Sequence, residues 1–312
     1  MDIRALRWDD DLDAQLDLGR RAFGPADAAA QARYLAELEA GIGGGQYHAA
    51  IPARSLAALP PAAAPEPAPP ALRRAGPGDA EQVIAVLGAV YASARHCGPV
   101  TRDTASVQRW LSDESLFCYL AEDGFLAYRW AGTNRDILVR AALAGSAAAT
   151  RALWSVVGSH ASIAERVLAV LPPDDPVAWL PREPDAEQTE REPWMLRVVD
   201  APAAVSGRGY PAVADLSVTL ELEDAQLAGN AGRWTLHVAG GRGSLRRHGT
   251  EAGAAAGPGA PVSLGSRGFA ALYAGVPMPT LRAAGLAAGG DAAADEALDC
   301  AFGASAFMLD EF

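Results

Sequence analysis

The sequence predicts an α/β domain followed by an α+β domain, with a short segment of strand and helix before them. Three observations predict this order. A proline-rich stretch at 60–70 divides the chain near its start, strand and helix patterns alternate over 71–205, and alternating apolar residues open 206–312. The 312 residues correspond to about two domains, and 50% of them are hydrophobic, which is enough to bury real cores.

The first element is the segment 1–59, which opens with a short strand pattern at 3–7 and continues with a helix pattern through Phe23. It is small, because domains usually have about 50–250 residues and most often 100–150. The stretch that follows, 60–70, reads Pro-Pro-Ala-Ala-Ala-Pro-Glu-Pro-Ala-Pro-Pro. Proline at this density forms neither a helix nor a central strand, so we expect a semi-rigid linker.

The domain at 71–205 repeats the strand–turn–helix opening and then continues. Asp79 with Gln82 three residues later is a capping-box signature, and apolar residues follow at helical spacing. Asp123-Gly124 lies between two apolar runs and predicts a hairpin. Further strands are predicted at 137–140, 166–171 and 194–200, with a helix near 152–157. Two openings of one type suggest a duplicated unit whose first copy is cut short.

The region 206–312 changes to the strand period of two. Leu216, Val218, Leu220 and Leu222 alternate with polar residues, and a second run with the same alternation centres on 234–238. This pattern is typical of antiparallel strands with one buried face. Because helices are predicted near 268–274 and 295–302, we expect an α+β domain.

The charge of the chain excludes several chemistries. It has 38 acidic residues against 26 basic ones, a net charge of −12, and every basic residue is an arginine. Without lysine it can form neither a Schiff base nor a phosphate-loop site of the usual kind. A chain this acidic, with no basic block, is not expected to bind nucleic acid, and it suits a cationic or amine-bearing partner better.

Cysteine and histidine spacing predicts neither disulfides nor a metal site. Cys97, Cys118 and Cys300 are odd in number and contain no close pair, and the five histidines show no ligand spacing. His96 is adjacent to Cys97, so their side chains are expected to diverge. No signal segment opens the sequence, and the most apolar tract, 141–149, is too short to span a membrane. We therefore expect a cytoplasmic protein without a membrane partner.

Five short motifs occur in a consistent order along the chain. They are 123–129, 194–204 together with Arg208-Gly209-Tyr210, 230–234, 272–275 and Asp310-Glu311-Phe312. Together they resemble the enhanced intracellular survival (Eis) family, closely over 72–312 and more loosely over 1–24. The resemblance implies two tandem GNAT domains and a sterol-carrier-like domain, in a protein that transfers acetyl groups from acetyl-CoA to amines.

On this basis the α/β plus α+β fold divides into four parts. A truncated GNAT-like segment is expected at 1–59, the linker at 60–70, an intact GNAT-like domain at 71–205 and a sterol-carrier-like domain at 206–312. The resemblance also implies four site residues. The terminal carboxylate of Phe312 would act as base toward the attacking amine, with Glu311 beside that amine. Tyr47 would act as general acid, and Asp27 would line the substrate cleft.

The sequence departs from the family in its first unit. That unit reaches the linker without room for the strand, glycine-containing turn and helix whose N–H groups bind the pyrophosphate of coenzyme A. We therefore hypothesise a diverged Eis-like protein that has no coenzyme A site of the usual kind and uses no cofactor. A carboxylate beside a bound ammonium can still take its proton and free the nitrogen lone pair. This predicts tailoring of an amine-bearing small molecule, such as cyclisation or group transfer in natural-product biosynthesis.

Two alternatives stay open. The chain is an acetyl-CoA-dependent amine N-acetyltransferase with a rearranged or partner-completed cofactor site, or it is a non-catalytic binding or scaffold subunit. A missing half-domain leaves apolar surface uncovered, which predicts a homo-oligomer or a second protein that completes the truncated half.

Overall fold

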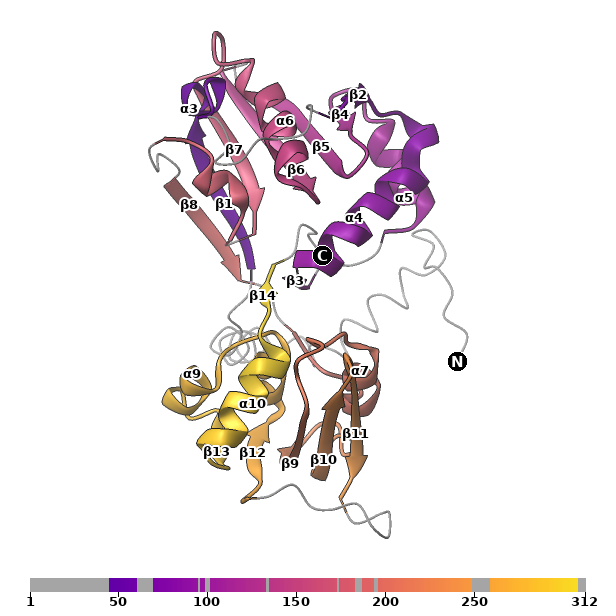
Figure 1. Cartoon of the computed structure of the whole chain (residues 1–312), viewed down its shortest axis with the longest axis vertical. Coiled ribbons are helices and arrows are strands. Elements are labelled where there is room, and N and C mark those ends of the chain that lie inside the picture. Colours follow the sequence, from indigo (N-terminus) through magenta and orange to yellow (C-terminus); the bar gives the residue numbers. More distant parts are fainter. Residues whose placement is uncertain are drawn as a thin grey trace, which may run out of the picture.

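The computed structural model describes residues 45–60, 70–94, 96–98, 102–132, 135–172, 174–182, 187–193, 196–248 and 259–307, with backbone alone at 45–47 and 187–193. These residues form a seven-stranded domain, 45–193, and a C-terminal domain, 201–307, stacked along the long axis of the molecule (Figure 1). The predicted α/β domain followed by an α+β domain is confirmed. The strand and helix expected before residue 44 lie outside the described residues.

Seven strands form the sheet of the first domain within the described residues. They are β1 (Gly45–Pro52), β2 (Arg73–Arg74), β4 (Phe117–Leu120), β5 (Gly124–Ala131), β6 (Asp136–Ala144), β7 (Arg166–Leu171) and β8 (Glu187–Pro193). Their order in the sheet is β2-β4-β5-β6-β7-β1-β8. Strands β4, β5 and β6 form an antiparallel meander, whereas β6 and β7 pair in parallel across helix α6 (Ala147–Gly158). The predicted hairpin at Asp123-Gly124 is the β4–β5 connection.

Helices cover both faces of this sheet. Helix α6 and the short helix α3 (Ala53–Ala57) pack on one face, where Leu153, Trp154 and Val157 are buried. Helix α4 (Ala80–Ala94) packs on the other face beside α5 (Thr104–Leu111). Gly124 of β5 packs tightly against α6, since a Cβ there would lie 3.1 Å from Leu153 and 3.3 Å from Ala149 and would push these side chains aside by a few tenths of an ångström.

The start of α4 differs from the predicted capping box. A 3₁₀ turn, η1 (Pro77–Asp79), precedes the helix, and the Asp79 carboxylate accepts a hydrogen bond from the Gly76 N–H at 2.8 Å. Gln82 does not reach back to the helix start but accepts a hydrogen bond from the Arg73 guanidinium at 2.9 Å. Arg73 also binds the Asp79 carboxylate, and this hydrogen bond lowers the pKa of Asp79 to about 2.

Strand β1 connects the N-terminal segment to this domain. It lies between β7 and β8 and pairs antiparallel with both, from Tyr47 opposite Leu171 to Pro52 opposite Arg166 on the β7 side. Helix α3, which follows it, touches α6 so closely that a Cβ at Gly158 would lie 2.2 Å from the Leu56 carbonyl oxygen. The segment predicted at 1–59 thus supplies an internal strand to the sheet of the next domain, while for residues 1–44 the division remains a prediction.

The strand predicted at 194–200 lies elsewhere. The last strand of the sheet is β8, at 187–193, and residues 196–200 form an irregular connection that ends at Asp200. The Asp200 carboxylate accepts a hydrogen bond from the Ala203 N–H and caps helix α7 (Ala201–Gly207). The apolar run before Asp200 therefore enters the core of the C-terminal domain through Val198 rather than a sheet.

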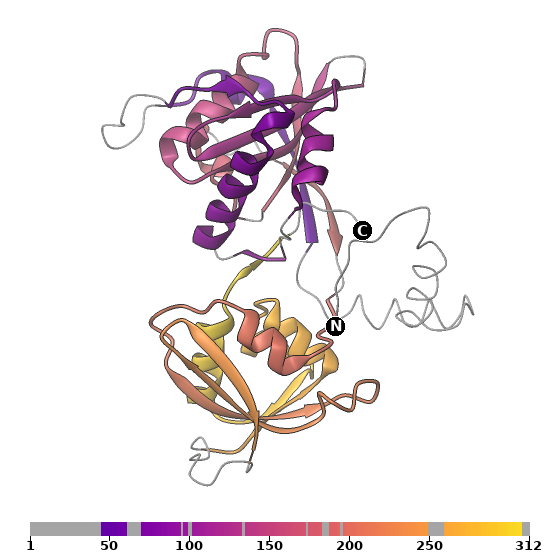
Figure 2. The same cartoon turned by 90° about the vertical axis from the view of Figure 1, so that its right-hand side faces the viewer.

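The C-terminal domain has a five-stranded sheet with helices on one side. The strands, in sheet order, are β11 (Arg242–Arg247), β10 (Gly232–Ala239), β9 (Leu216–Glu223), β12 (Val262–Gly265) and β13 (Ala287–Gly289). Besides α7, the helices are α8 (Ser266–Tyr273), α9 (Met278–Ala283) and α10 (Ala292–Phe302). The predicted alternating strands and the helices near 268–274 and 295–302 are confirmed. Figure 2 shows the helices between this sheet and the other domain.

Candidate functional site

A small parallel sheet joins the two domains. Strand β14 (Ser305–Ala306) leaves the end of α10 and pairs with β3 (His96–Cys97), which follows α4 in the seven-stranded domain. The Phe307 N–H then donates a hydrogen bond to the Cys97 carbonyl at 3.1 Å. Figure 1 shows β14 running between the domains. The last described strand of the chain is therefore held against the first domain.

Arg208 closes this junction from the C-terminal domain. Its guanidinium donates to the carbonyl of Phe302 at 2.9 Å and to the carbonyl of Tyr273, and it lies 4.9 Å from the Tyr273 ring centroid. The Cys97 thiol donates to the same Tyr273 carbonyl at 3.4 Å. One cation thus ties the ends of α8 and α10 together directly beneath β3, through charge-assisted hydrogen bonds and ring contacts.

Three polar side chains meet on the other side of the junction. The Ser305 hydroxyl donates to the Asp174 carboxylate at 2.8 Å, and Asp174 lies 3.7 Å from Nε2 of His96. The His96 side chain is only 5% exposed, and burial lowers its pKa although Asp174 opposes this shift. The serine hydroxyl donates to the carboxylate and not to the imidazole, so these three side chains are not arranged as a serine–histidine–acid triad, in which the imidazole takes the serine proton. The cluster is an interdomain contact.

The next residue, Asp175, is an unusual carboxyl. It is 5% exposed, and burial raises its pKa to about 7, with the neighbouring Asp174 charge acting in the same direction. Its Oδ1 accepts a hydrogen bond from the Val177 N–H at 2.8 Å and caps the turn η2 (Pro176–Trp179). It therefore changes charge close to neutral pH.

The structure places part of the expected site. Tyr47 lies in β1, where its backbone is opposite Leu171 and Arg191. The Gly45 end of β1 and strand β14 both lie on the side of the seven-stranded domain that faces the C-terminal domain (Figures 1 and 2). The Tyr47 side chain and the expected site residues Asp27, Glu311 and Phe312 lie outside what the structure describes, so their roles remain predictions.

The turn between β6 and α6 is the place in the described sheet where coenzyme A could be bound, because the N–H groups of a helix that follows a strand can bind a pyrophosphate. Here the Ser146 hydroxyl already accepts a hydrogen bond from the Ala149 N–H at 3.1 Å. The Asp123 carboxylate lies against the turn, 3.5 Å from where a Cβ of Gly145 would stand. A negative group at this helix start opposes a second anion, so the residues of this turn do not fit a pyrophosphate.

Two further expectations concern metals and membranes. Among the residues that the structure describes, no group of three histidine, cysteine or acidic side chains is arranged to hold a metal ion. Within that same part of the chain, no helix has the length and apolar character needed to cross a bilayer.

The chain thus consists of a mixed-sheet domain with a parallel β6–α6–β7 unit, joined to an α+β domain. Comparison with known families identifies the first as an acetyltransferase-type domain and the second as a sterol-carrier-type domain. The acetyltransferase (GNAT) domain matches residues 98–198, and the sterol carrier protein domain matches residues 201–309. A search of curated proteins finds no match.

Solved structures extend the comparison to the whole chain. A GCN5-related N-acetyltransferase from Kribbella flavida is 38% identical with a TM-score of 0.79, and the match covers 96% of this chain and 74% of that one. The chain therefore belongs to the GCN5-related N-acetyltransferase family. Two others share the fold at 23% identity. One is a GCN5-related N-acetyltransferase from Anabaena variabilis, with a TM-score of 0.73 and coverage of 96% and 76%. The other is Eis1 from Mycobacterium abscessus, with a TM-score of 0.64 and coverage of 89% and 70%.

Sequence reasoning did not identify the residues of the junction. Arg208 belongs to one of the motifs that carried the Eis resemblance, and this was the one available signal. The divergence of His96 and Cys97 was expected from their adjacency and is confirmed, since His96 faces Asp174 and Cys97 faces the Tyr273 carbonyl. Asp174 and Ser305 are 131 residues apart in sequence, and no local pattern relates them.

Proposed function

We propose that this family member binds an amine-bearing small molecule and acts on it without coenzyme A held at a GNAT helix start. Two observations support the proposal: the unit before the linker is too short for the usual coenzyme A turn, and the turn before α6 has the Asp123 carboxylate close to Gly145 and the Ser146 hydroxyl as its cap. The net charge of −12 supports a cationic ligand. We place the protein in the cytoplasm, with the ligand drawn from natural-product biosynthesis.

The chemistry follows from a carboxylate beside a bound ammonium. In this proposal the terminal carboxylate of Phe312 takes the ammonium proton, with Glu311 holding the amine and Asp27 lining the cleft. The freed lone pair attacks an electrophilic carbon of the same molecule. A nitrogen–carbon bond forms as the bond to the leaving group breaks, and Tyr47 supplies the proton that the leaving group needs. The result is a cyclised amine, formed without an acyl donor.

A second candidate is supported by the 38% identity to the N-acetyltransferase from Kribbella flavida. In this alternative the chain acetylates an amine from acetyl-CoA, in a site that is rearranged or completed by a second copy or another protein. The 74% coverage of that relative leaves a quarter of its length without a counterpart here. A binding or scaffold subunit without catalysis is the third candidate.

Calorimetric titration of the full chain with acetyl-CoA separates the first two candidates. We expect no heat of binding, and micromolar binding would overturn the proposal. The variant Asp123→Asn locates any binding that occurs. Removing this charge should strengthen binding at the turn before α6, whereas a site elsewhere would be unaffected.

Extending the chain beyond Phe312 by a short glycine–serine tail separates catalysis from scaffolding. The tail removes the free carboxylate from its position while leaving every described residue in place. Native mass spectrometry of protein from its own host identifies the bound amine, and conversion of that amine is then followed with both chains. Loss of conversion in the extended chain is expected, and equal conversion by both chains would contradict a role for the terminal carboxylate.

A further inference from the structure

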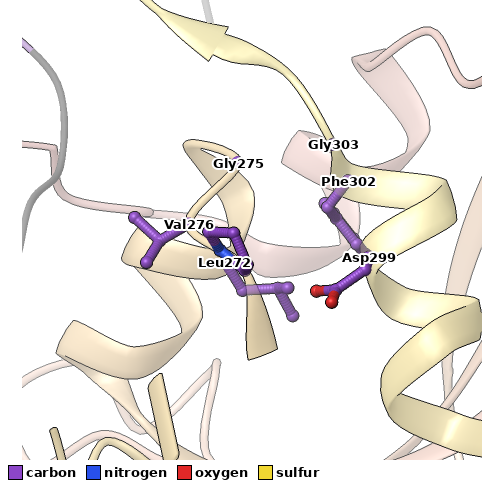
Figure 3. A pocket seen from close by; sticks show the side chains of 7 residues that line it. Leu272, Gly275, Val276, Asp299, Phe302 and Gly303 are labelled. Atoms are coloured by element: carbon purple, nitrogen blue, oxygen red, sulfur yellow. The ribbon is translucent and has the colours of Figure 1, made fainter. Parts of the chain in front are cut away.

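A cavity of about 130 Å³ lies in the C-terminal domain beside the junction. Its floor is Leu272 and Phe302, whose side chains are 0% and 1% exposed. Its rim is formed by the turn between α8 and α9 and by the end of α10. Figure 3 shows Asp299 and Phe302 projecting from α10 toward Leu272 near the end of α8 and Val276 in the turn after it. The walls are apolar except for one carboxylate, that of Asp299.

The carboxylate of Asp299 is only partly used by the protein. One oxygen, Oδ1, accepts a hydrogen bond from the Met278 N–H at 2.7 Å, which joins the end of α10 to the start of α9. Among the described residues, no donor binds the other oxygen, Oδ2. The two carboxylate oxygens face the cavity in Figure 3. An ionised carboxylate oxygen without a protein donor can accept a charge-assisted hydrogen bond from a cation that enters the cavity.

The position of Asp299 in its helix makes a cation more favourable still. It lies in the last turn of α10, where the unpaired carbonyl groups carry a partial negative charge, and this turn has no basic residue. Arg208 binds the Phe302 carbonyl from the junction side, so one cation already approaches this helix end. The cavity side has negative charge from both the helix end and Asp299.

We infer that this cavity binds a small ammonium whose other end is an aromatic ring or a branched alkyl group. The ammonium would donate to Oδ2 of Asp299, and the apolar end would pack on Val276 and Pro277 at the rim, since Leu272 and Phe302 beneath them are almost fully buried. A cavity of about 150 Å³ lined by apolar side chains accommodates a whole benzene ring, so this smaller cavity admits such a ring only in part. Phosphates and carboxylates are excluded by the charge.

This inference goes beyond the proposed function and does not depend on it. The cavity lies in the sterol-carrier-type domain, and its ligand needs no acyl donor. It also lies next to the interdomain strand, since Gly303 on its rim is two residues before Ser305 of β14. A Cβ at Gly275 would lie 2.3 Å from the Ala304 carbonyl oxygen, so the rim fits closely against the chain that leads into β14.

Titration of the full chain with benzylamine, and with benzyl alcohol as an uncharged probe of the same shape, tests the inference at pH 7 without acetyl-CoA. Benzylammonium should bind at least tenfold more tightly than benzyl alcohol, because only the ammonium can form a charge-assisted hydrogen bond with the carboxylate. Equal affinity for the two probes would overturn the inference. The acetyl-CoA titration is a separate measurement, so either result can fail alone.

Three variants locate the binding. Asp299→Asn keeps an oxygen for the Met278 N–H but removes the charge, so it should lose at least tenfold in benzylammonium affinity and leave benzyl alcohol unchanged. Glu296→Gln makes the same charge change on an exposed part of α10 and should change neither. Val276→Phe fills the cavity and should weaken both probes. Unchanged benzylammonium binding in Asp299→Asn would overturn the inference.

A last variant tests whether residues 308–312 of the chain itself fill the cavity. A chain that ends at residue 307 should bind benzylammonium as the full chain does. If only the shortened chain binds the probes, the cavity belongs to residues 308–312, and the inference is overturned.

Discussion

Two helix ends in this molecule treat charge in opposite ways. At the start of α6, where the partial positive charge of the helix would attract an anion, the Ser146 hydroxyl already accepts from the Ala149 N–H, and the Asp123 carboxylate lies close to Gly145. At the end of α10, where the partial charge is negative, Asp299 adds a further negative charge. The partial positive charge at the start of α6 is already matched by groups of the protein. The negative charge on the cavity side of the end of α10 is not matched by a cation among the described residues. The comparison teaches that in this chain the helix ends predict a site for a cation better than a site for a phosphate.

The largest expected effect comes from removing Arg208, the cation that, among the described residues, binds the end of α10. Arg208→Met removes two hydrogen bonds in a part-buried position, which leaves the Tyr273 carbonyl with only the weak Cys97 thiol donor and the Phe302 carbonyl without the guanidinium. We expect a loss of about 3 kcal/mol in the free energy of unfolding, measured with urea. Arg208→Lys keeps the charge but cannot bind both carbonyls in the same geometry. Its free energy of unfolding should therefore lie between that of the natural protein and that of Arg208→Met. A loss below about 1 kcal/mol in Arg208→Met would show that the junction does not depend on this cation.

The next largest effect concerns another helix start, that of the 3₁₀ turn η2, where the capping carboxyl of Asp175 is buried. Because the folded pKa of Asp175 is about 7 and its ordinary value is 3.8, the folded chain keeps a proton that the unfolded chain has lost between these pH values. The contribution of Asp175 to stability therefore falls as pH rises from about 4 to 7 and is constant above.

Asp175→Asn is neutral at every pH and keeps the acceptor for the Val177 N–H. Its Tm relative to the natural protein should rise by several degrees between pH 5 and pH 8. The nearby His96, whose pKa burial lowers, contributes in the opposite direction but is present in both chains. A constant difference across this range would contradict a raised pKa at Asp175.

A smaller effect is expected at the start of α6 itself. Ser146→Ala removes the hydrogen bond to the Ala149 N–H and should cost about 1 kcal/mol, as N-cap substitutions commonly do. Ser146→Asp restores an acceptor and should recover this loss only in part, because Asp123 is close. Full recovery in urea denaturation would show that the Asp123 charge is not felt at this helix start, and the comparison of the two ends would weaken.

The smallest effect is expected where the ion pair is exposed. Arg73 binds the Asp79 carboxylate at 2.7 Å, but its side chain is 51% exposed. Because the pKa of Asp79 is lowered to about 2, the contribution is present above pH 3.8 and is lost as pH falls through 2. Arg73→Gln should lower Tm only slightly at pH 7 and by less still at pH 2, where about half of the Asp79 carboxyl groups are protonated. A large fall in Tm at pH 7 would mean that the ion pair stabilises the η1 turn and is not merely a weak surface interaction.

Local patterns predicted the fold where neighbours in sequence are also neighbours in space. The alternation from Leu216 to Val238 gave two antiparallel strands, and Asp123-Gly124 gave the hairpin between β4 and β5. The strand predicted at 194–200 was wrong because an apolar run can enter a core without joining a sheet. The true last strand, β8, is rich in charged residues, lies at the end of the sheet order and has no alternation to reveal it.

The candidate site was less predictable than the fold. The resemblance identified Arg208-Gly209-Tyr210 as a motif but not the carbonyl groups that Arg208 binds, because backbone acceptors leave no mark in the sequence. The cluster of His96, Asp174 and Ser305 joins three distant parts of the chain. Asp299 reads as an ordinary surface acid in a helix, and only the adjacent turn at 275–277 makes it a wall of a cavity.

The place of β1 in its sheet has a consequence for synthesis. The strand leaves the ribosome early, yet it is hydrogen-bonded to β7 and β8, which are made more than a hundred residues later. Strand β1 therefore has no pairing partner in its sheet until the meander, α6 and β7 have been translated. Pairings of such long sequence separation are slow to form. During that interval an apolar strand end is available to chaperones, or to the same strand of another nascent chain, so the yield of folded protein should depend on how fast the middle of the message is read.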